Sequence, residues 1–223
     1  SFLKSFSELY STNYDLLLYW AILKGRIKSF FDDGFRSDVD SGELVWQKRG
    51  SQNVFYLHGA LHIFSRSMSW DSEVGERRKF SSALKNSIVK IEMTQQMNLI
   101  PQITKKIENG SFPLTVTDGL FEQKVQKIIN NPYLKNCFER FSQQRSNNLI
   151  SIGWSGSGSQ DQHIFDSLVD SYIQTWWFGV FRPSPSDLNK INRLLGQVNG
   201  ERTSLGKQPI KLEFFFSDTA PIW

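Results

Sequence analysis

Short apolar runs alternate along this chain with longer segments in which apolar residues recur every three or four positions. The short runs predict strands, and the recurring spacing predicts helices. We expect strands at 7–12, 44–46, 54–57, 61–64, 112–116, 149–152, 176–181 and 211–216. We expect helices at 14–24, 81–108, 119–130, 133–144, from about 161, and at 185–195, with loops at 32–41 and 199–209.

This alternation of strands and helices favours an α/β fold with a mainly parallel sheet. Most expected strands are apolar throughout, which is typical of strands covered on both faces. The chain has 223 residues, 39% of them hydrophobic, so it can bury a sizeable core, and one domain is the simplest organisation. It has neither a long uninterrupted apolar stretch nor a secretory signal, and we therefore expect a cytoplasmic protein without a membrane partner.

Charge and cysteine content narrow the possible functions. The net charge is +4, and lysines and arginines are interspersed along the chain, which argues against nucleic acid as a partner. The single cysteine, Cys137, excludes an internal disulfide and a four-cysteine zinc site, and we expect no bound metal. The chain begins at Ser1 and soon enters a strand, so we expect a preceding segment that belongs to the same domain.

Polar residues gather directly after three of the expected strands. In an open α/β sheet, ligands bind outside the carboxyl ends of the strands, so these residues are candidates for a binding site. They are Thr12, Asn13 and Asp15 after the first strand, His58 and Gly59 after 54–57, and Gly153, Ser155, Ser157 and Asp161 after 149–152. If the three strands are neighbours, their polar ends face one crevice.

The residue types in this set suggest a restricted chemistry. Asn13 can donate and accept hydrogen bonds without a charge, and His58 is a candidate general base near neutral pH. The glycine- and serine-rich loop at 153–159 leads into a helix, whose start favours phosphate or ribose oxygens. The sequence contains no nucleophile elbow, no G-x-G-x-x-G dinucleotide motif and no P-loop.

Each candidate also has a purely structural interpretation. Asn13 or Asp15 could cap the helix that follows, and His58 with Gly59 could form an ordinary turn. The glycine-rich loop could be a plain linker, and Asp161 could only complement a helix dipole. His62 and His163 could be core or surface histidines.

Four segments, taken in order, resemble the sirtuin-like NAD-binding superfamily, and most closely a bacterial branch of it. They are TNYD at 12–15, YLHGALH at 56–62, PLTVTDGLFEQKVQKIINNPYL at 113–134 and IGWSGSGSQDQHI at 152–164. The resemblance spans about 7–223. It implies a single Rossmann-like domain over 1–223, with a mainly parallel sheet flanked by helices and a helical insertion at about 81–145.

The resemblance also implies hydrolysis of NAD⁺ to nicotinamide and ADP-ribose, in the service of antiviral defence. Asn13 would position the ribose and the water, His58 would be the base, and Asp15 would organise the site. The cofactor contacts would come from Thr12, Gly59, Gly153, Ser155, Ser157 and Asp161. NAD would be the substrate or ligand, and the chain could form a homo-oligomer through aromatic residues such as Trp176 and Trp177.

Two departures from the family pattern leave an alternative open. Zinc-dependent deacylases of the superfamily use four cysteines, so this chain is not expected to be one. The family's N-terminal strand and phosphate-binding loop are missing before Asn13 in this chain. The alternative is therefore a module that binds or senses NAD⁺ or ADP-ribose without catalysis.

Overall fold

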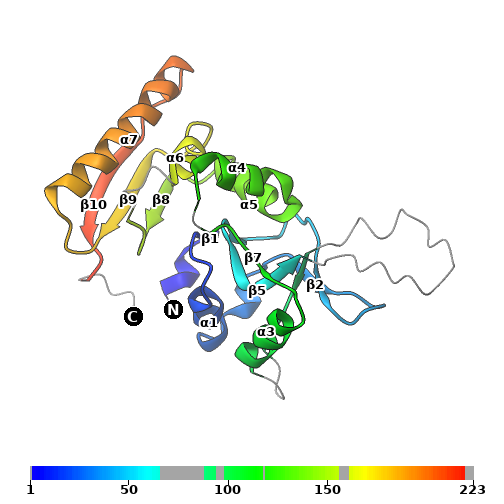
Figure 1. Cartoon of the computed structure of the whole chain (residues 1–223). Coiled ribbons are helices and arrows are strands. Elements are labelled where there is room, and N and C mark those ends of the chain that lie inside the picture. Colours follow the sequence, from blue (N-terminus) through cyan, green and yellow to red (C-terminus); the bar gives the residue numbers. More distant parts are fainter. Residues whose placement is uncertain (1, 66–87, 94–97, 118, 156–160, 219–223) are drawn as a thin grey trace. The chain divides into compact units, whose positions relative to one another are not determined.

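The computed structural model describes residues 2–65, 88–93, 98–117, 119–155 and 161–218. The chain forms two compact units, residues 1–116 and residues 117–223. Figure 1 shows strands and helices in both units, so the α/β class is confirmed. The expected Ser157 lies outside the described residues.

A pair of parallel strands opens the N-terminal unit. Strand β1 (Leu9–Ser11) pairs with β4 (Val54–Tyr56), with Leu9 opposite Val54 and Ser11 opposite Tyr56. The pairing continues one step further, because the backbone N–H of Leu57 donates to the carbonyl of Ser11 at 2.8 Å. The strands predicted at 7–12 and 54–57 are thereby confirmed, and they end at the same edge.

The larger sheet of this unit is antiparallel. Its strand order is β2-β3-β6-β5-β7, and every pairing in it is antiparallel. The strands are β2 (Phe35–Ser37), β3 (Leu44–Trp46), β5 (Gly59–Ser65), β6 (Ile88–Lys90) and β7 (Pro113–Thr115). The expectation of one mainly parallel sheet is therefore wrong for the largest sheet. The connection between β2 and β3 is too short for the crossover that parallel neighbours need.

Two of these strands correct the sequence-based assignment. Strand β2 lies inside the expected loop at 32–41, and β6 lies inside the expected helix at 81–108. The apolar residues around β6 recur at helical spacing, but all three of its residues are buried between β3 and β5. Tertiary pairing therefore decides the structure of this segment over its local periodicity.

Two of the helices of the N-terminal unit, α1 (Leu17–Lys24) and α3 (Leu99–Glu108), pack on one apolar cluster. The unit also contains η1 (Phe2–Ser5) and η2 (Lys28–Phe30). Tyr19 of α1 and Ile103 of α3 pack with Phe64 and Val89 of the antiparallel sheet. Both helices are thus held by apolar contacts with the same core.

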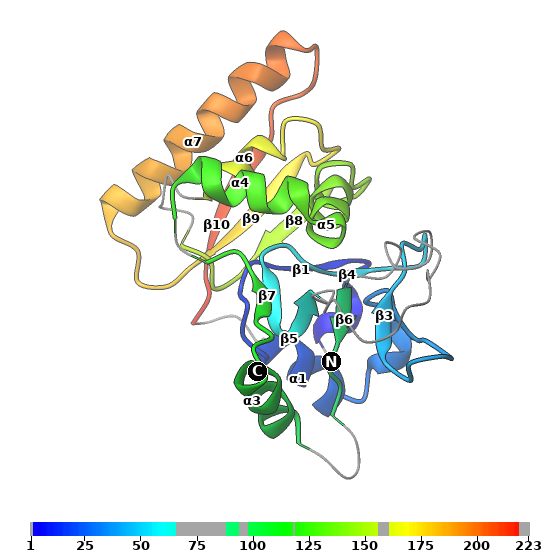
Figure 2. The same cartoon turned by 45° about the vertical axis from the view of Figure 1, so that its right-hand side comes forward.

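The C-terminal unit contains the parallel arrangement that the sequence predicts. Strands β8 (Asn148–Ser151), β9 (Thr175–Val180) and β10 (Lys211–Phe216) are parallel, in the order β10-β9-β8. Helix α6 (Gln162–Asp166) connects β8 to β9, and α7 (Pro185–Ser204) connects β9 to β10. Figures 1 and 2 show α7 beside this sheet. The unit is therefore a β-α-β-α-β arrangement with two crossover helices.

Two further helices, α4 (Phe121–Asn130) and α5 (Pro132–Ser142), precede β8 and confirm the helices expected there. The expected insertion at 81–145 thus contains α3, α4 and α5, but it also contains β6 and β7. Helix α7 is longer than the predicted 185–195, and it includes part of the expected loop at 199–209.

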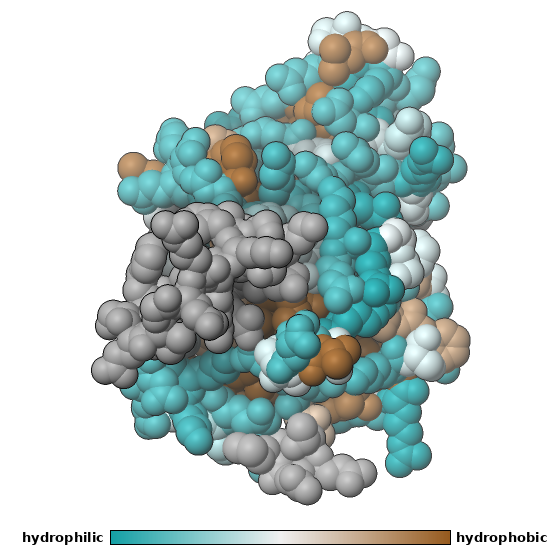
Figure 3. All heavy atoms as spheres, turned by 90° about the vertical axis from the view of Figure 1, so that its right-hand side faces the viewer, coloured by the Kyte–Doolittle hydropathy of each residue, from teal (hydrophilic) through white to brown (hydrophobic). Residues whose placement is uncertain are grey.

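One face of the molecule is mostly polar. Figure 3 shows hydrophilic residues over most of its coloured atoms, with hydrophobic residues in small separate groups. Trp176 is buried, whereas Trp177 is 42% exposed, so only the second of the two tryptophans is available for contacts with another molecule. Within the described part of the chain, no helix has both the length and the apolar character needed to cross a bilayer.

Candidate functional site

The carboxyl edge of the β1–β4 pair places two predicted residues together in the N-terminal unit. Asn13 follows β1 by two residues, and His58 follows β4 by two residues. Since Ser11 and Tyr56 are directly opposite each other in parallel register, both segments leave the pair at the same edge. The expected adjacency of these two strand ends is confirmed.

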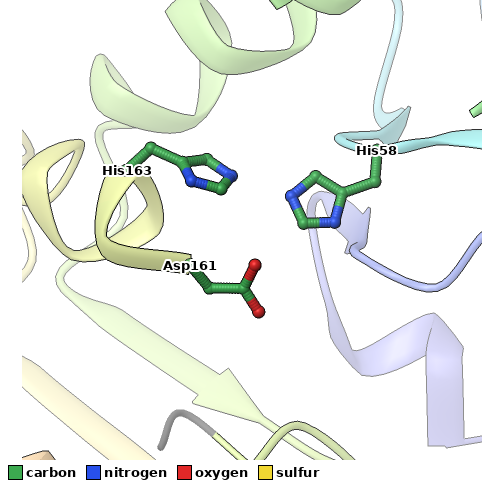
Figure 4. A group of neighbouring side chains, drawn as sticks. All are labelled: His58, Asp161 and His163. Carbon is green, nitrogen blue, oxygen red and sulfur yellow. The ribbon is translucent and has the colours of Figure 1, made fainter. Parts of the chain in front are cut away.

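His58 is hydrogen-bonded through its backbone to the residue that follows strand β7. Its side chain is buried, and its carbonyl accepts a hydrogen bond from the N–H of Val116 at 2.8 Å. The next residue, Gly59, has a φ of +76°, a left-handed conformation that glycine adopts without strain. This turn between β4 and β5 sets the direction in which the imidazole extends (Figure 4).

Gly59 has a backbone role in addition to any role in binding. A Cβ atom at this position would lie 1.9 Å from the carbonyl oxygen of Leu114 in β7. The alternative of an ordinary turn is thus confirmed, because close approach of two backbones and a positive φ both require glycine here. The cofactor contact expected of Gly59 stays a prediction.

Asp15 acts as a helix cap. Its Oδ1 accepts a hydrogen bond from the backbone N–H of Leu17, the first residue of α1, at 2.9 Å. This contact confirms the structural interpretation of Asp15 and fixes the chain between β1 and α1. A role for Asp15 in organising the site is compatible with the contact, because the cap lies two residues after Asn13.

Asn13 itself is exposed, and its neighbours are anchored. Its backbone carbonyl accepts a hydrogen bond from the hydroxyl of Ser11 at 3.0 Å. In the described part of the chain, no hydrogen bond involves its side-chain amide. Thr12 is half-buried beside it. The amide of Asn13 is therefore available to a ligand at this edge.

The C-terminal unit has a pocket at the carboxyl ends of its own three strands. Its volume is about 310 Å³. It lies where β8, β9 and β10 end and where α7 begins, which is the usual ligand position in an open parallel sheet. The lining residues are Gly153, Trp154, Ser155, Phe178, Gly179, Val180, Phe181, Pro183, Asp187, Ile191 and Ser217.

Two predicted residues, Gly153 and Ser155, lie in this pocket. Gly153 has a φ of +72°, so it turns the chain sharply after β8. Ser155 is exposed and presents a hydroxyl group to the pocket. Both residues follow β8, which belongs to a different sheet from β1 and β4, and their expected cofactor contacts stay predictions.

Asp161 does not line the pocket, but it is hydrogen-bonded to Trp154, which does. Its Oδ1 accepts a hydrogen bond from the buried ammonium of Lys124 at 3.1 Å, and its Oδ2 accepts one from Nε1 of Trp154 at 3.3 Å. Both oxygens are thus engaged within the C-terminal unit. Asp161 therefore positions the indole that lines the pocket, a role that the sequence did not reveal.

The other two histidines, His62 and His163, were not among the predicted site residues. Figure 4 shows His163 extending from the start of α6, close to Asp161. His163 is buried, and the ring of Phe138 lies 5.3 Å from its own. His62 in β5 is fully buried, and neither of its ring nitrogens has a hydrogen-bond partner in the structure. The core interpretation of His62 is thereby confirmed.

Burial, with a smaller contribution from the charge of Lys90, lowers the pKa of His62 to about 3. The imidazole is therefore neutral at physiological pH. It packs between two tyrosines, with ring centroids 4.9 Å from Tyr19 and 5.2 Å from Tyr56. It has no part in the edge that carries Asn13 and His58.

Apart from Gly153 and Ser155, the lining residues were not predicted from the sequence, and Trp154, Asp187 and Ser217 are the polar or aromatic ones with most bearing on a ligand. Ser217 directly follows β10, and Asp187 lies in the helix that follows β9. The segment PSPSD at 183–187 did hold a signal, since a serine three residues before an aspartate is typical of a helix start. The structure confirms that start at Pro185.

Comparison with known families gives one match. Residues 1–223 match the family described as a domain of unknown function, DUF4917, so the chain belongs to that family. No curated protein and no solved structure matches the chain.

Proposed function

We propose that this member of the DUF4917 family binds NAD⁺ and hydrolyses it to nicotinamide and ADP-ribose. One observation carries the proposal: Asn13 and His58, the two residues with suitable chemistry, follow two parallel strands that pair in register. The resemblance of TNYD and YLHGALH to sirtuin-like proteins supplies the reaction. The parallel pair supports it, because ligands bind at the carboxyl edge of such strands.

The chemistry follows from the two side chains. Breaking the bond between ribose C1′ and the nicotinamide nitrogen builds positive charge on the ribose, and nicotinamide leaves as a neutral molecule. The Asn13 amide would align the ribose and the attacking water without adding a charge of its own. Water would form the new bond to C1′, and His58 would accept the proton that it releases.

The C-terminal unit supports a nucleotide as the ligand. A β-α-β-α-β unit of parallel strands is the half-fold that binds mononucleotides, and its ligand lies at the carboxyl ends of the strands. The pocket of the C-terminal unit is in that place, with aromatic rings and hydroxyl groups in its lining. We propose that this pocket, taken by itself, binds the adenosine part of a nucleotide, in contact with Gly153 and Ser155.

A second function is favoured by the pocket of the C-terminal unit. The pocket is lined by residues of that unit, so it can bind a nucleotide without Asn13 or His58. A protein of this kind could bind NAD⁺ or ADP-ribose as a sensor without hydrolysing it. Measurement of the reaction itself separates the two functions.

The test is to incubate the chain with NAD⁺ and to follow nicotinamide and ADP-ribose by chromatography. We expect the wild type to release nicotinamide, and Asn13→Ala and His58→Gln to lose at least about 100-fold in rate, as is typical when a general base is removed. Asn109→Ala serves as the matched control, because Asn109 is an exposed asparagine in the same unit. Its rate should equal that of the wild type.

The outcomes distinguish the proposals. Release of nicotinamide that persists in both variants would show that Asn13 and His58 do not carry the reaction. If the wild type binds NAD⁺ in a calorimetric titration but releases no nicotinamide, the sensing function replaces the hydrolase. Absence of both binding and turnover would refute both functions.

A further inference from the structure

The pocket of the C-terminal unit contains one charged residue, Asp187, and its carboxylate is held in a fixed orientation. Asp187 lies in the first turn of α7 and forms a reciprocal capping box with Ser184. Its Oδ2 accepts hydrogen bonds from the hydroxyl of Ser184 at 2.7 Å and from the backbone N–H of Ser184 at 3.2 Å. Ser184 Oγ in turn accepts from the N–H of Asp187 at 3.2 Å.

These contacts leave one carboxylate oxygen for a ligand. Both bonds from Ser184 go to Oδ2, and among the described residues no donor contacts Oδ1. The box fixes the rotamer, so a ligand need not order this side chain when it binds. Hydrogen bonds from Ser184 lower the pKa of Asp187, with a minor contribution from the charge of Lys190, so the group is ionised at neutral pH.

The charge of Asp187 decides which part of a nucleotide the pocket accepts. The start of a helix usually attracts phosphate groups. Here the carboxylate already occupies that position, and no lysine or arginine is among the described residues of the lining. A phosphate group beside Asp187 would therefore be repelled by the carboxylate. A pair of hydroxyl groups would instead find a charged acceptor, which makes stronger hydrogen bonds than a neutral one.

The rest of the lining fits an uncharged, aromatic partner. Trp154 and Phe181 offer ring surfaces on which a flat base can pack, and the buried ring of Phe178 supports Trp154 from behind. Ser155 adds a hydroxyl group that can donate or accept, and Ser217, whose hydroxyl donates to the carbonyl of Val180 at 3.1 Å, can accept. Rings, hydroxyls and a single carboxylate together match a nucleoside, in which a base is joined to a sugar with two neighbouring hydroxyls.

We propose that Asp187 accepts hydrogen bonds from the 2′- and 3′-hydroxyls of the adenosine ribose, so that the pocket binds NAD⁺ and excludes NADP⁺, which carries a 2′-phosphate. The inference rests on the proposed function only in taking an adenine dinucleotide as the ligand. It adds a specificity-determining residue and a substrate preference, and it holds for a hydrolase and for a sensor alike.

The test compares ADP-ribose with 2′-phospho-ADP-ribose by calorimetric titration of the chain, because neither has a nicotinamide bond to hydrolyse. We expect the wild type to bind ADP-ribose at least about tenfold more tightly, in line with the loss of one charge-assisted hydrogen bond. Asp187→Asn keeps the shape and removes the charge. This variant should reduce the ratio of the two dissociation constants about tenfold.

Ser184→Ala is the matched control. It breaks the same capping box from the other side and keeps the carboxylate, so it carries a similar loss of helix capping without a change in charge. Its ratio of dissociation constants should stay within about twofold of that of the wild type. A ratio is unaffected by the fraction of folded protein, so a general loss of stability cannot imitate the expected result.

Several results would overturn the inference. Equal affinity of the wild type for the two compounds would do so, and so would an unchanged ratio in Asp187→Asn. Binding of neither compound would also do so. Release of nicotinamide is measured separately, so the hydrolase proposal stands or falls independently of these titrations.

Discussion

Gly59 makes the turn between β4 and β5 possible, and its replacement tests how tightly β7 closes on that turn. A Cβ atom at this position would overlap the carbonyl oxygen of Leu114, and the positive φ adds strain for any other residue. We expect Gly59→Ala to lower the free energy of unfolding by about 3 kcal/mol or more. Urea denaturation measures the change.

Gly110 provides the comparison for this experiment. It also has a left-handed conformation, with a φ of +79°, but no atom lies within 4 Å of a Cβ placed there. Gly110→Ala should therefore cost only about 1 kcal/mol. If the two variants lose equal stability, the contact with β7 contributes nothing and the turn is held by its backbone conformation alone.

His62 makes the stability of the protein depend on pH. Its pKa is about 3 in the folded chain and about 6.5 in an unfolded one, so the unfolded state binds the proton more readily. The contribution of the neutral imidazole to the free energy of unfolding is fully present above about pH 6.5 and is lost as the pH falls towards 3. We expect the loss to approach about 1.4 kcal/mol per pH unit in that window.

The variant His62→Phe tests this assignment, because a phenyl ring fills similar space and cannot bind a proton. Its free energy of unfolding, measured by urea denaturation at pH 7, 6 and 5, should fall less steeply than that of the wild type. The variant should also be no less stable than the wild type at pH 7, because the substitution removes two buried ring nitrogens that have no hydrogen-bond partner. Identical slopes in the two proteins would assign the acid sensitivity to other groups.

At the scale of elements, α7 shows how one buried side chain joins several segments. The guanidinium of Arg202 is 3% exposed and has no acidic partner at hydrogen-bond distance among the described residues. It donates instead to five backbone carbonyls, those of Leu168, Val169, Ser171, Ile173 and Gln208. The end of α7 is thereby tied to the segments before β9 and before β10.

Replacement of Arg202 should leave those carbonyls without donors. We expect Arg202→Met to destabilise the protein by about 3 kcal/mol, because several buried acceptors lose their hydrogen bonds together. Arg193→Met is the control, since Arg193 is exposed on the same helix and should change the stability by less than about 0.5 kcal/mol. Thermal unfolding followed by circular dichroism compares them, and equal melting temperatures would contradict the assignment.

The same helix shows where sequence-based prediction of elements fails. The sequence predicts that this helix ends near 195. However, Val198 and Arg202 are buried, and their contacts extend α7 to Ser204. Strand β10 was predicted with its exact bounds, because a run of aromatic residues favours a strand and the flanking proline and serine mark its limits. Local patterns thus identify elements whose own composition is decisive, and miss those that depend on distant contacts.

At the scale of the whole molecule, the sequence predicted the class of the fold better than its sheets. An alternation of strands and helices does not specify which strands pair, and the antiparallel sheet of the N-terminal unit follows from short connections and from the pairing of β6. The candidate site was partly predictable. Asn13 and His58 could be proposed because polar residues at strand ends are visible in the sequence, whereas Asp187 lies in a pocket whose other walls come from the ends of three strands.

The β1–β4 pair also has a consequence for the order in which the protein acquires its structure during synthesis. Leu9 and Val54 lie about 45 residues apart, so β1 must wait for the ribosome to release β4 before it can pair. Val116, which anchors the carbonyl of His58, is translated later still. Contacts between such distant positions form slowly. A nascent N-terminal unit therefore cannot complete the contacts that hold the backbone of His58 until Val116 has been synthesised.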